Sequence, residues 1–330
     1  MTSLREIFGG SFDIGVALGG TLPDDYAPWE RALIDAHFTA ITPENCMKPA
    51  AIQPAEGVFT FAEADSLVAF AEATGKRVTA HCLIWHEACP EWFFRDGDQL
   101  ASRAVVLARM EAHIATLAGR YRGRVYSWDV VNEALTDGDG YLRDTPWVRQ
   151  IGDDAVVQAY RFAHTADPDV RLVYNDYNIE QPAKREKTVR LLRELSDAGV
   201  PIAAVGIQGH WRLDSVPYAQ IEEAIDTFHA LGLEVMFTEV DLDVVLEQEG
   251  DPYATGCPPE VLERQAAQYA ALFQLFHRQR EKITRVAFWG LHDGRSWLNA
   301  WPRRRTNYPL LFDRHGLPKP ALAGVLATRG

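Results

Sequence analysis

The sequence predicts a single-domain α/β protein, a (β/α)8 TIM barrel spanning residues 1–330, and three observations support this fold class. Short apolar runs rich in β-forming residues alternate with longer helix-like segments, which is typical of parallel strands joined by helical crossovers. This unit occurs eight times in 330 residues, which suits a closed barrel better than an open doubly wound sheet. Polar residues also end seven of the eight runs, and barrels of this kind carry their functional groups at the carboxyl ends of strands.

Each predicted strand is a short apolar run bounded by polar or turn-forming residues. The eight runs are Phe12–Leu18, Phe38–Pro43, Arg77–Trp85, Val125–Val131, Val170–Asn175, Ala204–Gln208, Glu234–Thr238 and Thr284–Gly290. No Gly-x-Gly-x-x-Gly segment follows the first run, and this argues against a dinucleotide-binding sheet.

The predicted helices carry apolar residues at three- and four-residue spacing. They are Ala62–Thr74, Leu100–Tyr121, Asp154–Ala166, Ala183–Gly199, Tyr218–Leu231 and Val261–Lys282. Gly75 follows the first of them, where a helix C-terminus favours glycine.

The composition narrows the range of partners. With 33 basic and 46 acidic residues the net charge is −13, so we expect no nucleic acid and no anionic membrane surface as partner. No run reaches the roughly 18 apolar residues of a membrane span. The start MTSLREIFGGSF lacks a signal peptide, so the chain as written is expected in the cytoplasm, or secreted if a signal was trimmed. Nothing in the sequence indicates the oligomeric state.

The four cysteines are Cys46, Cys82, Cys89 and Cys257. A chain of this length needs no disulfides to stabilise its core, so we expect reduced thiols. The six residues between Cys82 and Cys89 do not match a zinc knuckle, and no metal or other cofactor is expected.

Two glutamates close predicted strands on opposite sides of the barrel. Glu133 ends the fourth strand and Glu239 the seventh. Two carboxyl groups about 5–5.5 Å apart suit a double displacement at a glycosidic carbon, in which one protonates the leaving oxygen and the other attacks. The alternative is a pair of surface glutamates with ordinary salt-bridge partners.

Neighbouring residues distinguish the two roles. His210 is placed to donate a hydrogen bond to Glu239, and Asp241, on the same side of an extended strand as Glu239, is placed to orient His210. Such bonds keep a carboxylate ionised, so Glu239 is the expected nucleophile. Glu133, beside that negative charge, is the expected general acid and base. Asn132 suits a bond to the sugar 2-hydroxyl. The alternatives are a core histidine at His210 and a structural amide at Asn132.

Other strand ends carry residues suited to binding sugar. Glu44, Asn45 and Lys48 form one cluster, with a solvated turn as the alternative reading. At the third strand, His81 is expected to hydrogen-bond sugar and His86 to be structural. Odd separation places these two histidines on opposite faces of a strand, which argues against a zinc site.

Aromatic residues are dense near the same strand ends. They are Trp85, Tyr177, Trp211, Trp289, Trp297 and Trp301. Indole rings stack on the C–H face of a pyranose, and Trp289 and Trp297 are the preferred platforms because they flank a loop. Trp128, inside a strand, is expected in the core. Asn175 and Asp176 are expected to support the site.

Taken together, these motifs resemble glycoside hydrolase family 10, the endo-β-1,4-xylanases, over nearly the whole chain. The motifs are ITPEN followed by MK (Ile41–Lys48), H-x-L-x-W-H, WDVVNE, NDYN, QGHW, TEVD, SW followed by W (Ser296–Trp301) and YPLLFD (Tyr308–Asp313). The resemblance implies retention of configuration, no metal cofactor, and xylan or a xylo-oligosaccharide as substrate.

The resemblance also implies a role for each matching residue. Glu133 becomes the acid/base and Glu239 the nucleophile. The residues implied around the non-reducing-side sugars are Glu44, Asn45, Lys48, His81 and Trp85. Those implied around the cleavage point are Asn132, Gln208, His210, Trp289 and Trp297.

One position departs from the family pattern. Ala88 stands where the family usually has Gln, so one side-chain contact to a sugar two subsites from the cut is expected to be lost. A neutral hydrogen bond contributes about 0.5–1.5 kcal/mol, which would change chain-length preference rather than catalysis. Glu87 is a candidate substitute, and short xylo-oligosaccharides are a candidate substrate. The remaining alternatives are a barrel β-glucanase or mannanase, and a sugar-binding barrel without catalysis.

Overall fold

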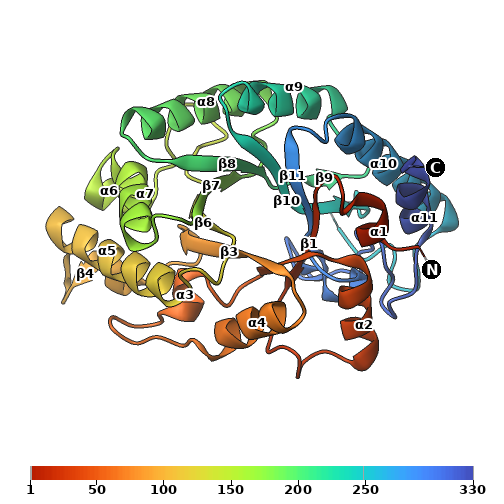
Figure 1. The fold of residues 1–330 in the computed structure, drawn as a ribbon, viewed down its shortest axis with the longest axis horizontal. Helices are drawn as coiled ribbons and strands as arrows, with labels where there is room; N and C mark the ends of the chain where they lie inside the picture. The colour runs from red at the N-terminus through yellow and green to blue at the C-terminus, as the bar shows by residue number, and fades with distance from the viewer. Residues whose placement is uncertain (1, 248, 330) are drawn as a thin grey trace.

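A computed structural model describes residues 2–247 and 249–329. Eight parallel strands form the barrel: β1 (Asp13–Leu18), β2 (Ala40–Pro43), β3 (Arg77–Ile84), β6 (Ser127–Asn132), β7 (Arg171–Asp176), β8 (Ile202–Ile207), β10 (Glu234–Asp243) and β11 (Ile283–Phe288). Each pairs with the next, and β11 pairs with both β10 and β1, which closes the sheet. The predicted (β/α)8 barrel is therefore confirmed (Figure 1).

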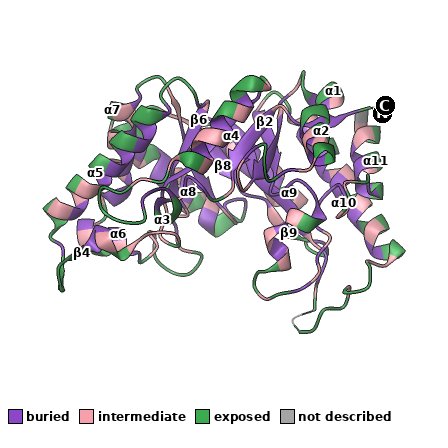
Figure 2. Cartoon of the chain, turned by 90° about the horizontal axis from the view of Figure 1, so that it is seen from below, coloured by how far each residue is buried: buried purple, intermediate pink, exposed green. Residues whose placement is uncertain are grey.

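Helices connect successive strands and surround them (Figure 1). The larger ones are α2 (Pro28–His37), α4 (Ala62–Ala73), α5 (Arg103–Arg120), α7 (Ala155–Ala166), α8 (Pro182–Asp197), α9 (Tyr218–His229) and α10 (Pro259–Arg278). Six of these seven match predicted helices to within a few residues. They pack an apolar face on the strands and expose the other, as Figure 2 shows by colour.

Short elements fill the connections. They are the helices α1 (Leu4–Phe8), α3 (Pro49–Ile52), α6 (Pro146–Ile151) and α11 (Pro320–Leu326), the hairpin β4 (Arg95–Asp96) and β5 (Gln99–Leu100), strand β9 (His210–Arg212), and the 3-10 turns Glu91–Phe94, Asp293–Arg295, Trp297–Asn299 and Ala327–Arg329.

The seventh barrel strand is longer than the sequence pattern indicates. The apolar run Glu234–Thr238 continues as strand to Asp243, because β9 pairs with its second half, with His210 opposite Asp241 and Arg212 opposite Asp243. Polar residues interrupt the apolar pattern in the paired part of β10, so apolar periodicity alone could not reveal this pairing. It also places His210 beside two acidic residues of β10.

The core agrees with the other predictions that the structure tests. Trp128 is completely buried, and all four cysteines are free thiols, with Cys46 and Cys82 buried. Within residues 2–247 and 249–329, no helix is both long and apolar enough to cross a membrane.

Candidate active site

Both glutamates lie at the carboxyl end of the barrel, where parallel strands present their last residues. Glu133 directly follows β6, whereas Glu239 lies within β10. Glu133 has a φ of 58°, one of two positive φ values among the described non-glycine residues. A side-chain-bearing residue in this left-handed conformation costs roughly 1–3 kcal/mol, so its surroundings must hold it there.

Three donors surround the Glu133 carboxyl group. Trp85 Nε1 donates to Oε2 at 3.0 Å, and Gln208 Nε2 donates to Oε1 at 3.0 Å. The amide of Asn132 donates to Oε1 at 3.3 Å. These contacts come from the ends of β3, β6 and β8, so three separate strand ends define where this carboxyl group lies.

Glu239 is almost completely buried, at 4% exposure, and its carboxyl group also has hydrogen-bond donors in fixed positions. Asn175 Nδ2 donates to Oε1 at 2.7 Å, and His210 Nε2 contacts Oε2 at 3.1 Å. Burial acts to raise the pKa of Glu239, but the hydrogen bond from His210 and the charges of His81 and His210 outweigh it and hold the pKa below its usual value. Glu239 is therefore ionised at neutral pH.

His210 lies between two carboxyl groups. Its Nδ1 contacts Asp241 Oδ1 at 3.0 Å, and Trp297 Nε1 donates to the other oxygen of Asp241 at 2.8 Å. Burial would lower the pKa of His210, but the attraction of Asp241 and hydrogen bonds to both carboxylates raise it to about 10. The imidazolium thus donates from both nitrogens, and the contacts anticipated for His210 and Asp241 are both present.

Amide groups connect the two glutamates. Asn132 Oδ1 accepts from Asn175 Nδ2 at 3.0 Å and from Gln208 Nε2 at 3.3 Å. Because Asn175 also binds Glu239 and Gln208 also binds Glu133, both carboxyl groups belong to one hydrogen-bonded array across the mouth of the barrel.

The cluster after β2 faces two tryptophans. Lys48 Nζ donates to Asn45 Oδ1 at 2.9 Å and lies 4.8 Å from the ring centre of Trp85 and 6.0 Å from that of Trp289. Burial raises the pKa of Glu44, and Lys48 opposes this. A cavity of about 410 Å³ opens beside Glu44.

The histidines at the end of β3 have separate partners. His81 contacts Asp129 at 2.8 Å, and His86 lies 3.5 Å from Glu87. Among the described residues, no three His, Cys, Asp or Glu side chains are grouped so that they could hold a metal ion. Glu87 is exposed and turns toward His86, and Ala88 uses its carbonyl to accept from Ala50 N at 2.9 Å.

The tryptophans fall into different environments. Trp289 is only 6% exposed and contacts His81 and His210 edge-on. Trp297 stacks on Trp301, which is 57% exposed. Trp211 is buried and donates to Glu180 at 2.9 Å, so it belongs to the core.

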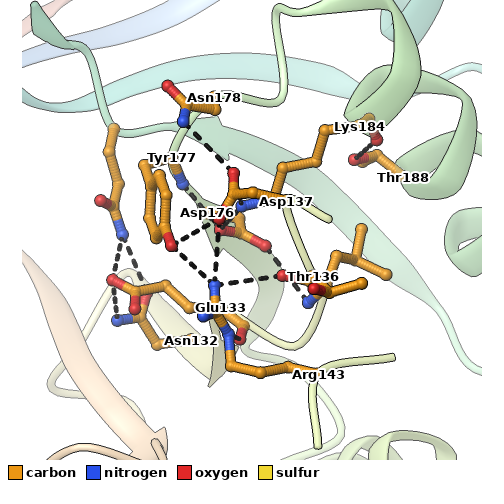
Figure 3. Close-up of polar contacts among 12 residues, drawn as sticks. Asn132, Glu133, Thr136, Asp137, Arg143, Asp176, Tyr177, Asn178, Lys184 and Thr188 are labelled. Atoms are coloured by element: carbon orange, nitrogen blue, oxygen red, sulfur yellow. Dashed lines mark hydrogen bonds and ion pairs between the residues drawn. The ribbon is translucent and has the colours of Figure 1, made fainter. Parts of the chain in front are cut away.

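A second polar network lies behind Glu133, and of its members only Asp176 was expected from the sequence to support the site. Asp176 Oδ1 accepts from Lys184 Nζ at 2.9 Å, and Tyr177 donates to Asp137 at 2.7 Å (Figure 3). Arg143 donates to Tyr177 at 2.7 Å. The NDYN segment indicated a polar strand end, but Asp137 and Arg143 lie in a loop with no motif of its own.

This geometry provides the parts for acid-base and nucleophilic chemistry at one bond. One buried carboxylate is kept ionised by a protonated histidine. A second carboxyl group, connected to the first through a shared amide array, could donate and accept a proton.

Known proteins are similar to this chain over nearly its whole length. A β-1,4-xylanase of Dictyoglomus thermophilum is 40% identical over 321 residues, 97% of this chain and 89% of that protein. A solved family 10 endoxylanase from a sugarcane soil metagenome superposes with a TM-score of 0.95 at 39% identity and covers 100% of both chains. A solved structure in complex with xylotriose has a TM-score of 0.93, 39% identity and 99% coverage of each chain. Residues 3–328 match the model of glycosyl hydrolase family 10, and the chain belongs to that family.

Proposed function

We propose that this glycoside hydrolase is an endo-1,4-β-xylanase that retains configuration, with Glu239 as nucleophile and Glu133 as general acid and base. The observation that carries the proposal is the unequal environment of the two carboxyl groups. Glu239 is buried against an imidazolium and an amide donor, whereas Glu133 is bound by neutral donors only.

The first step follows from the ionised state of Glu239. Its carboxylate attacks the anomeric carbon, the glycosidic C–O bond breaks, and Glu133 gives its proton to the departing oxygen. This forms a glycosyl ester on Glu239. The bonds from His210 and Asn175 hold the attacking oxygens in place while the charge is consumed.

The second step reverses the role of Glu133. Once Glu239 is esterified, its negative charge is gone. Glu133 as carboxylate takes a proton from water, the water oxygen bonds to the anomeric carbon, and the ester C–O bond breaks to release Glu239 as carboxylate. Asn132 uses one amide hydrogen for Glu133. The other remains for the sugar 2-hydroxyl, a bond that strengthens in an oxocarbenium-like transition state.

The remaining predicted residues are proposed to bind sugar. Glu44, Asn45 and Lys48 supply charged and amide groups beside the indoles of Trp85 and Trp289. Trp297 adds a further ring, and His81, held by Asp129, adds a donor. The relatives named as xylanases and the xylotriose complex support a xylose-based chain over glucan or mannan.

Stereochemistry and substrate can be tested together. Proton NMR during hydrolysis of xylohexaose is expected to show the β-anomer of the new reducing end first, with slower conversion to α. Cellohexaose and mannohexaose, run in parallel, are expected to react far more slowly because they carry an exocyclic CH2OH on each ring. Immediate appearance of the α-anomer would refute the mechanism. Faster cleavage of cellohexaose would refute the substrate, and binding of xylohexaose without turnover would favour the sugar-binding alternative.

We further propose that Ala88 shifts preference toward short xylo-oligosaccharides. Glu87, the candidate substitute, lies 3.5 Å from His86, and this contact supports the proposal that it does not replace the missing amide. Ala88→Gln is expected to restore about 0.5–1.5 kcal/mol of binding to longer chains. The measurement is kcat/KM for xylotriose, xylohexaose and polymeric xylan. Equal changes in kcat/KM for all three substrates would contradict the proposed preference for short chains.

A further inference from the structure

We propose that Arg143 is a positioning residue for Glu133: its guanidinium holds the left-handed backbone at Glu133 and so directs the carboxyl group toward the substrate. The inference rests on the assignment of Glu133 as acid and base.

The guanidinium contacts the main chain on both sides of the residue that follows Glu133. Nε donates to the carbonyl oxygen of Glu133 at 3.1 Å, and Nη2 donates to that of Leu135 at 3.2 Å. Nη2 also donates to the Tyr177 hydroxyl group at 2.7 Å. Figure 3 shows Arg143 beside Glu133 with these contacts around its guanidinium.

The conformation of Glu133 explains why such a clamp is needed. With a φ of 58°, Glu133 occupies a region that residues with a Cβ rarely adopt. Its N–H donates to the Asn175 carbonyl oxygen at 3.0 Å, so one side of the peptide is held by β7. Arg143 holds the other side through the carbonyl oxygen. Relaxation to an ordinary φ would swing the carboxyl group away from Trp85 and Gln208.

Arg143 is itself held in place by the loop that follows Glu133. Leu135 and Leu142 form an antiparallel bridge, and Arg143 N donates to the Ala134 carbonyl oxygen at 2.7 Å. The loop is tied to α8, because Lys187 Nζ donates to the Thr136 carbonyl oxygen at 2.9 Å. The loop thus folds back, so that Arg143 at its end contacts Glu133 at its start.

The shape of the guanidinium matters more here than its charge. A planar fork can donate to several acceptors at fixed angles, whereas a lysine ammonium acts as a point charge. Asp137 lies 3.5 Å from Arg143 and offsets its positive charge. We therefore expect loss of Arg143 to disturb the direction of proton transfer from Glu133.

Aryl xylobiosides with leaving groups of graded acidity test this role. In Arg143→Ala, kcat/KM is expected to fall by about a hundredfold for poor leaving groups, the typical effect of a small misplacement. It should stay nearly unchanged for dinitrophenolate, which needs no proton. Arg143→Lys should fall in between. The pH profile of the residual activity should keep the wild-type limbs.

Arg149→Ala is the matched control. Arg149 is an exposed arginine on α6 that pairs with Asp144, and no contact described for it reaches Glu133. It should leave both kcat/KM and the melting temperature unchanged. If Arg143→Ala does not fold, the same aryl xylobiosides are tested on Arg143→Lys and Tyr177→Phe. Both variants are expected to keep the loop folded and to weaken the contacts of Arg143, so they test the positioning role.

A uniform loss for all leaving groups, or no loss, would overturn the positioning role. The assignment of Glu133 is checked separately by Glu133→Ala. If that variant shows a steep leaving-group dependence and Arg143→Ala does not, only the role of Arg143 fails. If neither shows it, the acid/base assignment fails as well.

Discussion

Asn175 donates to Glu239 Oε1 at 2.7 Å and to Asn132 Oδ1 at 3.0 Å from the same amide nitrogen. Its own oxygen accepts from Thr238 Oγ1 at 2.6 Å. Both amide hydrogens and the oxygen are therefore engaged, and Asn175 is completely buried. Asn175 is therefore held in one orientation. Because Asn175 binds Glu239, the position of the proposed nucleophile depends on the packing around Asn175, one layer below the site.

Gly206 is the residue whose missing side chain makes room for Asn175. A Cβ at Gly206 would lie 2.5 Å from Asn175 Oδ1 and 2.8 Å from Thr238 Cγ2. We expect Gly206→Ala to displace the amide, to cost about 1–3 kcal/mol of stability as other overpacked sites do, and to lower kcat on xylohexaose. Urea unfolding and steady-state kinetics measure the two effects.

Gly15→Ala separates overpacking from displacement of Asn175. A Cβ there would lie 2.8 Å from the Ala287 side chain, in the barrel interior but away from the amide array. A similar loss of stability with kcat unchanged is expected. If both variants lose kcat equally, the effect belongs to the barrel as a whole, and Asn175 has no special part in it.

Glu133→Ala should divide substrates by leaving group. Xylo-oligosaccharides need a proton on the departing oxygen, so kcat/KM should fall by about 10²–10⁴-fold, the usual contribution of a general acid. Dinitrophenyl xylobioside should keep most of its kcat/KM. Its kcat should still fall, because water attack then lacks a base. Equal loss of kcat/KM on both substrates would show that Glu133 is not the acid.

His210→Gln should move the acid limb of the pH profile. Burial acts to raise the pKa of Glu239, and the His210 imidazolium counters it. Without that cation the pKa of Glu239 rises, so the acid limb of kcat/KM should shift to higher pH by about one to two units. The limb is measured on an activated aryl xylobioside between pH 3 and 7.

Asp241→Asn is the companion variant. Asp241 helps raise the pKa of His210 to about 10, and without it that pKa falls while His210 stays protonated in acid. The acid limb should therefore stay where it is in the wild-type enzyme. A shift in Asp241→Asn as large as in His210→Gln would mean that His210 does not set the pKa of Glu239.

The sequence was sufficient for the barrel because its strands and helices have strong apolar periodicity. Val170–Asn175 and Glu234–Thr238 are apolar runs whose polar ends mark the site. The second half of β10 was missed because Asp241 and Asp243 interrupt the apolar pattern, and its pairing with β9 depends on a neighbour brought close only by the fold.

The grouping of Glu133, Glu239 and His210 was predictable, because chemistry and strand position coincide at these residues. The site was not predictable where the role of a residue depends on the direction in which its side chain points. The indole N–H of Trp85 points at Glu133, Trp211 turns into the core, and Arg143 reaches back along a loop. Residue type and spacing do not encode such orientations, which arise from tertiary packing.

Lys184 and Asp176 form a buried ion pair behind Glu133, and removing one partner should lower the free energy of unfolding. Their side chains are 4% and 0% exposed, with Nζ 2.9 Å from Oδ1. Lys184→Met would leave the Asp176 charge buried without a cation, which typically costs about 3–5 kcal/mol. Lys282→Met, which breaks the exposed pair with Asp226, should cost less than about 1 kcal/mol.

The cost of Lys184→Met should depend on pH in a definite direction. Burial raises the pKa of Asp176 above its usual value to about 6, even though Lys184 lowers it. Removing Lys184 raises this pKa further above 6, so the folded variant takes up a proton that the unfolded chain does not hold, and its stability rises as the pH falls through the raised pKa. Urea unfolding should therefore show a large difference from wild type at pH 8 and a clearly smaller one at pH 5. An equal difference at both pH values would mean that the variant is destabilised by altered packing and not by an unpaired carboxylate.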